Sequence, residues 1–194
     1  SRVDSALRFD LRYATKDNFV GRAIYPEARC LLRRAVAEKI VRAQRWIEAR
    51  HPKLHLLLKD CYRPHHAQHV LWNAVRGTSH ARYVANPHGV TGSLHSYGAS
   101  VDVTLVDAKG RELYMGTPYD FFGALAEPRL ELEHLRAALL TREQVTNRET
   151  LRRAMREGGL RGIAREWWHF DDGTPQQVRT KYARMDLPFS AISH

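Results

Sequence analysis

Residues 92–102, which read GSLHSYGASVD, constrain this chain more than any other stretch. Residues 101–106 are rich in β-branched side chains and predict a strand. Because side chains alternate across a strand, Asp102 faces away from Val101, and the turn-prone residues before the strand let His95 approach the same carboxylate. A histidine from a loop and an aspartate from a rigid strand are therefore expected to lie close together.

A second stretch, EWWH at residues 166–169, supplies another imidazole and another carboxylate. We predict that His95, Asp102 and His169 bind one Zn²⁺ per chain, because three nitrogen and oxygen ligands leave a fourth position for water. Glu166 is the predicted base beside that water. Glu166 and His169 lie on opposite faces of an ideal strand. Both reach one metal only if the backbone bends or bulges there, or if the stretch forms a helical turn.

The two stretches follow the patterns S-x-H-x-x-G-x-S-x-D at residues 93–102 and E-x-W-H at residues 166–169. They resemble the zinc D,D-peptidases, and most closely the D-alanyl-D-alanine dipeptidases of the vancomycin-resistance type. Similar segments follow the family's order along nearly the whole chain, namely YAT at 13–15, DNF at 17–19, DCYRP at 60–64 and GTPYDFF at 116–122. Two features depart from the family. Tyr97 stands where an arginine is usual, at the expected rim of the pocket, and residues 123–140 match no family segment.

The resemblance also implies roles for residues outside the two main motifs. Arg63, at the end of a predicted strand and fixed by the following proline, is expected to be catalytic and to stabilise an oxyanion beside the zinc. The alternative is a surface arginine paired with Asp60. Asp120 is expected to bind the ammonium of a dipeptide, and the alternative is a helix cap. Ser93 is expected to help hold the substrate's amino end. Tyr13 lies either near that end or simply at the end of a strand.

The implied activity is zinc-dependent hydrolysis of D-Ala-D-Ala or a related D,D-dipeptide from the cell wall. A dipeptide has both termini close to its peptide bond, so a closed, charged cavity selects short substrates. One alternative is a D,D- or L,D-specific peptidase of the same superfamily that acts on longer peptidoglycan stems. A second alternative is a zinc-bearing binding module without activity, and the presence of both Glu166 and Arg63 argues against it.

Periodicity along the rest of the chain predicts an α+β fold with helices around a small, mainly antiparallel sheet. The resemblance implies the hedgehog/D,D-peptidase-like form of the zinc D,D-peptidase fold. No repeat, linker or low-complexity tract interrupts the sequence, so we expect one domain over residues 1–194. The expected strands are residues 7–13, with Leu7, Phe9 and Leu11 on the inner face, and residues 54–59, 101–106 and 112–115. The expected helices are residues 27–50, residues 65–75 with Leu71, Ala74 and Val75 facing inward, and residues 141–158, which open with a capping box at Thr141–Gln144; residues 123–140 are expected to be partly helical. A turn is expected at residues 171–173.

Further histidines cluster in the middle of the chain, at His65, His66, His69, His80 and His88. His65 and His69 are spaced i, i+4 on a predicted helix, which suits metal chelation. No glutamate follows His65 to give the His-Glu-x-x-His motif of zinc peptidases. We therefore interpret these residues as surface histidines.

The chain carries 31 Lys and Arg against 21 Asp and Glu, a net charge of +10. The arginines are scattered rather than gathered in the basic stripe of a nucleic-acid-binding protein, so we interpret them as parts of solvated faces. Apolar residues make up 43% of the chain, and no apolar run reaches the roughly 18 residues of a membrane span. The expected partner is a small dipeptide, not nucleic acid or a membrane. The sequence makes no prediction of oligomeric state.

The two cysteines, Cys30 and Cys61, are expected to form a disulfide. The bond would tie the start of the first long helix to the strand that leads to Arg63, and would be worth roughly 3 to 4 kcal/mol on the chain-entropy model. Two separate buried thiols are the alternative. A disulfide implies an oxidising compartment, so the expected location is periplasmic or exported, with a cytoplasmic location as the alternative.

Overall fold

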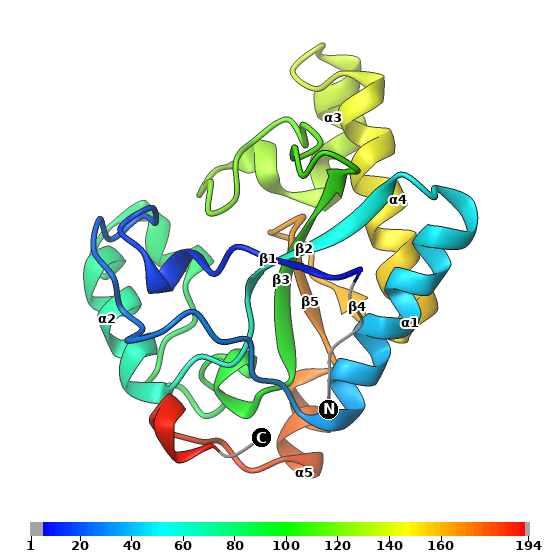
Figure 1. Ribbon diagram of the computed structural model, residues 1–194. Coiled ribbons are helices and arrows are strands. Elements are labelled where there is room, and N and C mark those ends of the chain that lie inside the picture. Colours follow the sequence, from blue (N-terminus) through cyan, green and yellow to red (C-terminus); the bar gives the residue numbers. More distant parts are fainter. Residues whose placement is uncertain (1–5, 193–194) are drawn as a thin grey trace.

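The computed structural model describes residues 6–192, and a five-stranded mixed sheet lies at its centre (Figure 1). The strands, in their order across the sheet, are β1 (Arg8–Phe9), β2 (Leu54–Asp60), β3 (Ser100–Asp107), β5 (His169–Asp171) and β4 (Arg161–Gly162). β1 pairs with β2 in parallel, whereas the β2–β3, β3–β5 and β5–β4 pairs are antiparallel. The described helices are α1 (Arg34–Arg50), α2 (His65–Val75), α3 (Glu131–Arg136), α4 (Arg142–Gly158) and α5 (Pro175–Lys181). The predicted α+β class is confirmed.

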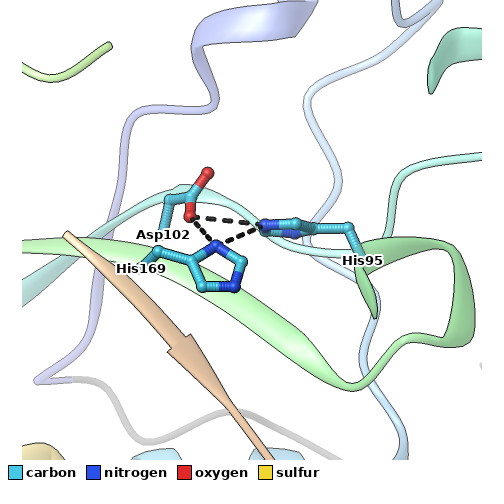
Figure 2. Close-up of side chains that lie close together, drawn as sticks. All are labelled: His95, Asp102 and His169. Atoms are coloured by element: carbon cyan, nitrogen blue, oxygen red, sulfur yellow. Dashed lines mark hydrogen bonds and ion pairs between the residues drawn. The ribbon is translucent and has the colours of Figure 1, made fainter. Parts of the chain in front are cut away.

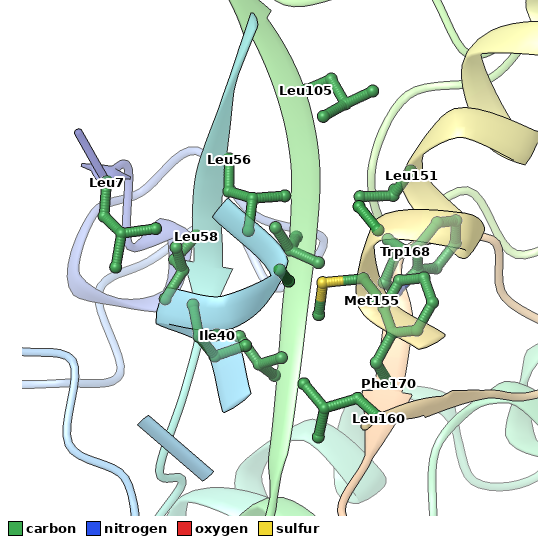
Figure 3. Close-up of a cluster of buried hydrophobic side chains, with 14 of the residues drawn as sticks. Leu7, Ile40, Leu56, Leu58, Leu105, Leu151, Met155, Leu160, Trp168 and Phe170 are labelled. Atoms are coloured by element: carbon green, nitrogen blue, oxygen red, sulfur yellow. The ribbon is translucent and has the colours of Figure 1, made fainter. Parts of the chain in front are cut away.

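The helices α1 and α4 lie side by side against one face of the sheet, and α2 lies apart from them on the other side (Figure 1). Apolar residues of α1 and α4 meet those of β2, β3 and β5 in the main core, which includes Ile40, Leu56, Leu58, Leu151, Met155, Trp168 and Phe170 (Figure 3). Gly158 permits the close approach of the two helices, because a Cβ there would lie 2.5 Å from the Lys39 carbonyl oxygen.

A second apolar cluster covers the side of the sheet that carries α2. It contains Tyr13, Tyr25, Leu71, Val75, Val84 and Phe189. Ala67 and Gln68 of α2 are fully buried, whereas Ala74, which the helical pattern suggested would face inward, is exposed. This cluster supports the edge of the sheet where β2 ends, and the site residues lie there.

Strands β2 and β3 form the centre of the sheet, and their pairing changes register near the site. Leu58 pairs with Val103 and Asp60 pairs with Asp102, with an irregularity between Leu58 and Asp60. Such bulges re-aim side chains at the ends of strands. Asp60 therefore lies opposite Asp102 instead of following the regular alternation of β2.

Two predicted elements are shorter in the structure. The helix expected over residues 27–50 begins only at Arg34, because backbone groups before it pair with other segments: the Leu31 carbonyl accepts from the Tyr62 amide at 2.9 Å, and the Arg33 amide donates to the Gly98 carbonyl at 3.0 Å. The strand expected over residues 7–13 is reduced to β1. This edge strand pairs only at Arg8 and Phe9, and Phe9, which the alternation placed inside, is 45% exposed.

The segment after β3 also departs from expectation. The return strand predicted at residues 112–115 forms a single bridge, between Val106 and Glu112, before the chain turns at Gly116 with φ +86°. Residues 123–140 contain short 3₁₀ turns and α3, in agreement with the prediction of partial helix. The capping box predicted at Thr141 is present, with Gln144 as its partner, and opens α4. Within residues 6–192, no helix is both long enough and apolar enough to cross a membrane.

Candidate active site

The three predicted metal ligands come from different elements and meet at the end of β3 (Figure 2). His95 lies in the short 3₁₀ turn Leu94–Tyr97, Asp102 in β3 and His169 in β5, where Asp102 and His169 are paired neighbours. Within residues 6–192 they are the one group of three His, Cys, Asp or Glu residues whose ligand atoms all lie within 4.8 Å of one another. The structure thus brings together all three residues that the motifs indicated.

The spacing of the donor atoms suits a small tetrahedral metal ion. His95 Nε2 lies 3.2 Å from His169 Nδ1 and 3.3 Å from Asp102 Oδ1, and His169 Nδ1 lies 3.0 Å from Asp102 Oδ1. Ligands bound to zinc at about 2.0–2.1 Å with tetrahedral angles lie about 3.3 Å apart. Two imidazoles and one carboxylate are also a donor set that zinc prefers. The residues present therefore fit a zinc ion.

Neighbouring acceptors fix which nitrogen of each imidazole faces the centre. His95 Nδ1 donates to the Cys61 carbonyl at 2.7 Å, which leaves Nε2 to bind a metal. His169 Nε2 donates to Asp171 Oδ1 at 2.8 Å, which leaves Nδ1 for the same purpose. Asp171 Oδ1 also accepts from the Ser100 hydroxyl at 2.6 Å. Such outer contacts orient metal-binding imidazoles and raise their basicity.

The Asp102 carboxylate is held in its charged form. Burial alone would raise the pKa of Asp102, but His95 and His169 hold it well below its usual range. Its Oδ2 atom accepts a hydrogen bond from the Tyr119 hydroxyl at 3.0 Å and lies 3.7 Å from Arg63 Nη2. One oxygen of Asp102 therefore faces the two imidazoles, while the other is fixed by the protein.

Glu166 lies next to the donor atoms but outside their triangle. Its Oε2 atom is 3.9 Å from His169 Nδ1, and its side chain is 11% exposed. Burial raises the pKa of Glu166 to about 7, with His169 acting to lower it and Asp102 to raise it. The backbone bends at residues 167–168, just before β5, and the Trp168 carbonyl accepts from the Val103 amide at 2.9 Å. This bend, rather than a helical turn, places Glu166 and His169 on the same side.

Arg63 is buried rather than on the surface, and it pairs with Asp60, as one of the two sequence interpretations expected. Its Nε and Nη2 atoms donate to Asp60 Oδ2 at 3.0 and 2.6 Å, and its Nη1 atom donates to Gln68 Oε1 at 2.8 Å. The guanidinium also lies over the Tyr13 ring, 5.0 Å from its centroid. Burial would lower the pKa of Arg63, but Asp60 and its other neighbours raise it well above the usual value. Arg63 is thus a fixed cation at the edge of the cavity.

Tyr13 and Asp120 form a pair in the same cavity, next to Arg63. The Tyr13 hydroxyl donates to Asp120 Oδ2 at 2.9 Å. Asp120 has φ +60°, a conformation that costs energy for a non-glycine residue and is often found at functional sites. Burial, and next the charge of Asp102, raise the pKa of Asp120 well above its usual range. A carboxyl group of this kind is stabilised in its charged form by a cation that binds beside it.

One cavity of about 270 Å³ connects these groups. Its lining includes every predicted site residue apart from the cysteines, namely Tyr13, Arg63, Ser93, His95, Asp102, Asp120, Glu166 and His169. Tyr97, expected at the rim, is buried next to the site instead, and its hydroxyl donates to the Thr91 carbonyl at 3.1 Å. The residue that differs from the family pattern therefore lies behind the cavity wall.

Three residues that support the site were not found from the sequence. Asp171 was interpreted as part of a turn, although its place two residues after His169 on a strand put both on one face. Gln68 and Tyr119, which contact Arg63 and Asp102, carry no local signal of such a role.

Cys30 and Cys61 are joined by a disulfide, as expected. Cys30 lies in the segment before α1, not at the start of the helix as predicted. The bond fixes the residue that follows β2, and this residue contacts two groups of the site. The Cys61 carbonyl orients His95, and the Cys61 amide donates to Asp60 Oδ1 at 2.9 Å.

Three convergent donors beside a carboxylate and a guanidinium are the groups with which metal-dependent hydrolases work. Comparison with known proteins points the same way. A family model described as D-ala-D-ala dipeptidase, in peptidase family M15, matches residues 1–188. The chain therefore belongs to the D-ala-D-ala dipeptidase family, a family of metallopeptidase type.

Individual relatives carry the same name. The chain is 37% identical over 169 residues to a D-alanyl-D-alanine dipeptidase of Escherichia coli (strain K12), which covers 85% of this chain and 78% of that protein. It is 33% identical over 182 residues to one of Streptomyces coelicolor, covering 86% of both chains. It is 31% identical over 180 residues to one of Enterococcus faecalis (strain V583), covering 84% of this chain and 85% of that protein.

Proposed function

We propose that this protein is a zinc-dependent dipeptidase that hydrolyses D-Ala-D-Ala or a related D,D-dipeptide. The observation that carries the proposal is the triangle of donor atoms 3.0–3.3 Å apart, with Glu166 Oε2 only 3.9 Å from His169 Nδ1. The names of the relatives support the choice of substrate. The family supports the hedgehog/D,D-peptidase-like fold as the fold of a single domain.

His95, Asp102 and His169 hold the zinc, which when bound lowers the pKa of a water molecule and polarises the scissile carbonyl. Glu166 accepts the proton of the attacking water and donates it to the leaving amine. A pKa of about 7 in the metal-free site suits both steps, because the group gains and loses a proton near neutral pH.

Arg63 stabilises the oxyanion of the tetrahedral intermediate. Asp60 and Gln68 fix its guanidinium before the substrate arrives, so little reorganisation is needed as charge develops. Its Nη2 atom is 3.7 Å from Asp102 Oδ2, which places the cation next to the metal ligands. Arg63 therefore contributes to the rate more than to ground-state binding.

Asp120, supported by Tyr13, binds the ammonium of the dipeptide, and Ser93, which lines the same cavity, helps to hold that end. The ion pair forms in a largely buried place, where screening by water is weak. A small cavity with a carboxylate at the amino end excludes peptides that continue beyond that end. This argues against longer peptidoglycan stems, the main alternative substrate.

The test is an assay of the zinc-loaded protein on all four stereoisomers of Ala-Ala, on N-acetyl-D-Ala-D-Ala and on a stem pentapeptide. We expect rapid hydrolysis of D-Ala-D-Ala and little of the blocked or longer peptides. Equal or faster cleavage of the pentapeptide would favour the alternative. Absence of hydrolysis of every substrate by fully zinc-loaded protein would leave the binding module. A cell-wall substrate and a disulfide both suit a periplasmic or exported enzyme.

A further inference from the structure

Outside the candidate active site, three histidines lie together beside the cavity. His65 and His69 are on α2, and His88 is in the loop of residues 85–92. The ring centroids of His65 and His69 are 4.8 Å apart, and those of His69 and His88 are also 4.8 Å apart. The interpretation of these residues as separate surface histidines misses this cluster, because the loop folds back over α2 only in the tertiary structure.

The geometry of His65 and His69 matches that of the active-site imidazoles. Their Nε2 atoms lie 3.3 Å apart, close to the distance of about 3.3 Å between two ligands of a tetrahedral zinc ion. In the active site, His95 Nε2 and His169 Nδ1 lie 3.2 Å apart, with ring centroids separated by 4.9 Å. The two pairs therefore have similar distances between their facing nitrogens and between their ring centroids.

The ring nitrogens of His65 form few hydrogen bonds to other groups. His65 Nδ1 is buried and has no hydrogen-bond partner within residues 6–192, and its Nε2 atom faces only His69 among the hydrogen-bonding groups there. His66, the next residue on the same helix, differs in this respect. Its Nδ1 atom and its amide both contact Asp186 Oδ1, at 2.7 and 2.9 Å. His66 therefore provides a matched control.

The position of His88 connects the cluster to the cavity. Ala85, Thr91 and Gly92 of the same loop line the cavity. Gln68 of α2 donates to the Ala85 carbonyl at 2.7 Å and accepts from Arg63 at 2.8 Å. A cation bound by histidines of both α2 and this loop would join the two segments a second time, in addition to the Gln68–Ala85 hydrogen bond.

We propose that His65, His69 and His88 form a second binding site for a borderline transition-metal cation such as Zn²⁺, Cu²⁺ or Ni²⁺. His65 and His69 form the chelating pair, and the exposed His88 becomes the third ligand by side-chain rotation. Imidazole is a suitable ligand for all of these cations. The second site is weaker than the first, because one of its ligands must be ordered and it contains no carboxylate. Its occupancy ties the cavity-lining loop to α2.

The first test uses Cu²⁺ as the probe, added to protein that already carries one equivalent of zinc. We expect one further equivalent of copper, with an electron paramagnetic resonance spectrum split by at least two imidazole nitrogens. His66→Ala keeps this copper and His69→Ala loses it. His169→Ala, which is tested without added zinc because it loses most of that ion, also binds this copper, which separates the site from the active centre. Equal copper binding by the wild-type protein and His69→Ala would overturn the proposal. No outcome depends on peptidase activity.

The second test measures the link to the loop by amide hydrogen exchange. We expect slower exchange in residues 85–92 when one equivalent of copper binds to the zinc-loaded protein, and no such change in His88→Ala, which retains the chelating pair. Unchanged exchange in the wild-type protein with copper bound would show that His88 is not a ligand and would overturn that part of the proposal.

Discussion

The carbonyl oxygen of Cys61 lies 2.7 Å from His95 Nδ1, so a disulfide-bonded residue sets the orientation of a proposed metal ligand. Two residues later the same chain segment delivers Arg63. The disulfide therefore lies next to both a proposed metal ligand and the proposed oxyanion-stabilising arginine. The disulfide is therefore expected to affect the site as well as the stability of the fold.

We expect Cys30→Ser/Cys61→Ser to lower both stability and zinc affinity. Loss of the bond is worth roughly 3 to 4 kcal/mol on the chain-entropy model. Thermal unfolding and zinc competition with a chelator measure the two effects. As a comparison, Ser100→Ala removes a hydrogen bond to Asp171 without touching the β2 end. Zinc affinity equal to that of the wild-type protein in the double variant would show that the Cys61 carbonyl holds His95 without help from the disulfide.

Loss of a proposed metal ligand is expected to reduce zinc binding more than loss of a residue that orients one. His169→Ala loses most zinc and activity, because two remaining ligands make a poor site. Asp171→Asn keeps the three ligands but weakens zinc binding about 10- to 100-fold, since the carboxylate no longer orients His169. Elemental analysis and chelator competition measure both. Stoichiometric zinc in His169→Ala would contradict the assignment.

The pH profile is expected to report Glu166. The group acts as a base only when deprotonated, so activity falls as pH falls through its pKa. That pKa is about 7 without metal, and a bound divalent cation lowers it, so the acid limb lies at or below pH 7. Glu166→Gln keeps zinc, loses at least about a hundredfold in rate and loses this limb. Release of zinc by the variant would identify Glu166 as a ligand instead.

Arg63→Lys is expected to lower kcat by roughly a hundred- to a thousandfold, with a smaller effect on KM. One ammonium cannot reproduce the planar set of donors that contacts Asp60 and Gln68 while facing the substrate. Lysine keeps the positive charge beside Asp60, so the variant is more suitable than Arg63→Ala for separating catalysis from folding. Steady-state kinetics with a parallel measurement of Tm is the test. A loss confined to KM would assign Arg63 to ground-state binding.

Asp120→Ala is expected to impair hydrolysis of free D-Ala-D-Ala far more than that of the N-acetylated dipeptide. The free substrate carries an ammonium for this carboxylate, and the blocked substrate does not. Comparison of kcat/KM for the two peptides, with Tyr13→Phe as a variant that retains the carboxylate, makes the test specific. Equal losses on both substrates would remove Asp120 from the amino-end site.

Much of the site could be predicted from the sequence, because its ligands lie in two short motifs. In β3 the strand period alone places Asp102 on the face opposite Val101, and the turn before it brings His95 near. The capping box at Thr141 and the helix of residues 65–75 are also local features, and both were predicted correctly. Local patterns suffice where neighbouring residues decide the structure.

Only the tertiary structure decided how these groups are held. The start of α1 depends on backbone bonds to Tyr62 and Gly98, which no helical period records. Which nitrogen of each imidazole faces the proposed metal depends on acceptors elsewhere in the chain, the Cys61 carbonyl for one and Asp171 for the other. The meeting of His88 with α2 likewise depends on a loop that folds back. Hydrogen bonds and metal sites join residues that are distant in sequence, so their geometry is fixed by packing and not by local pattern.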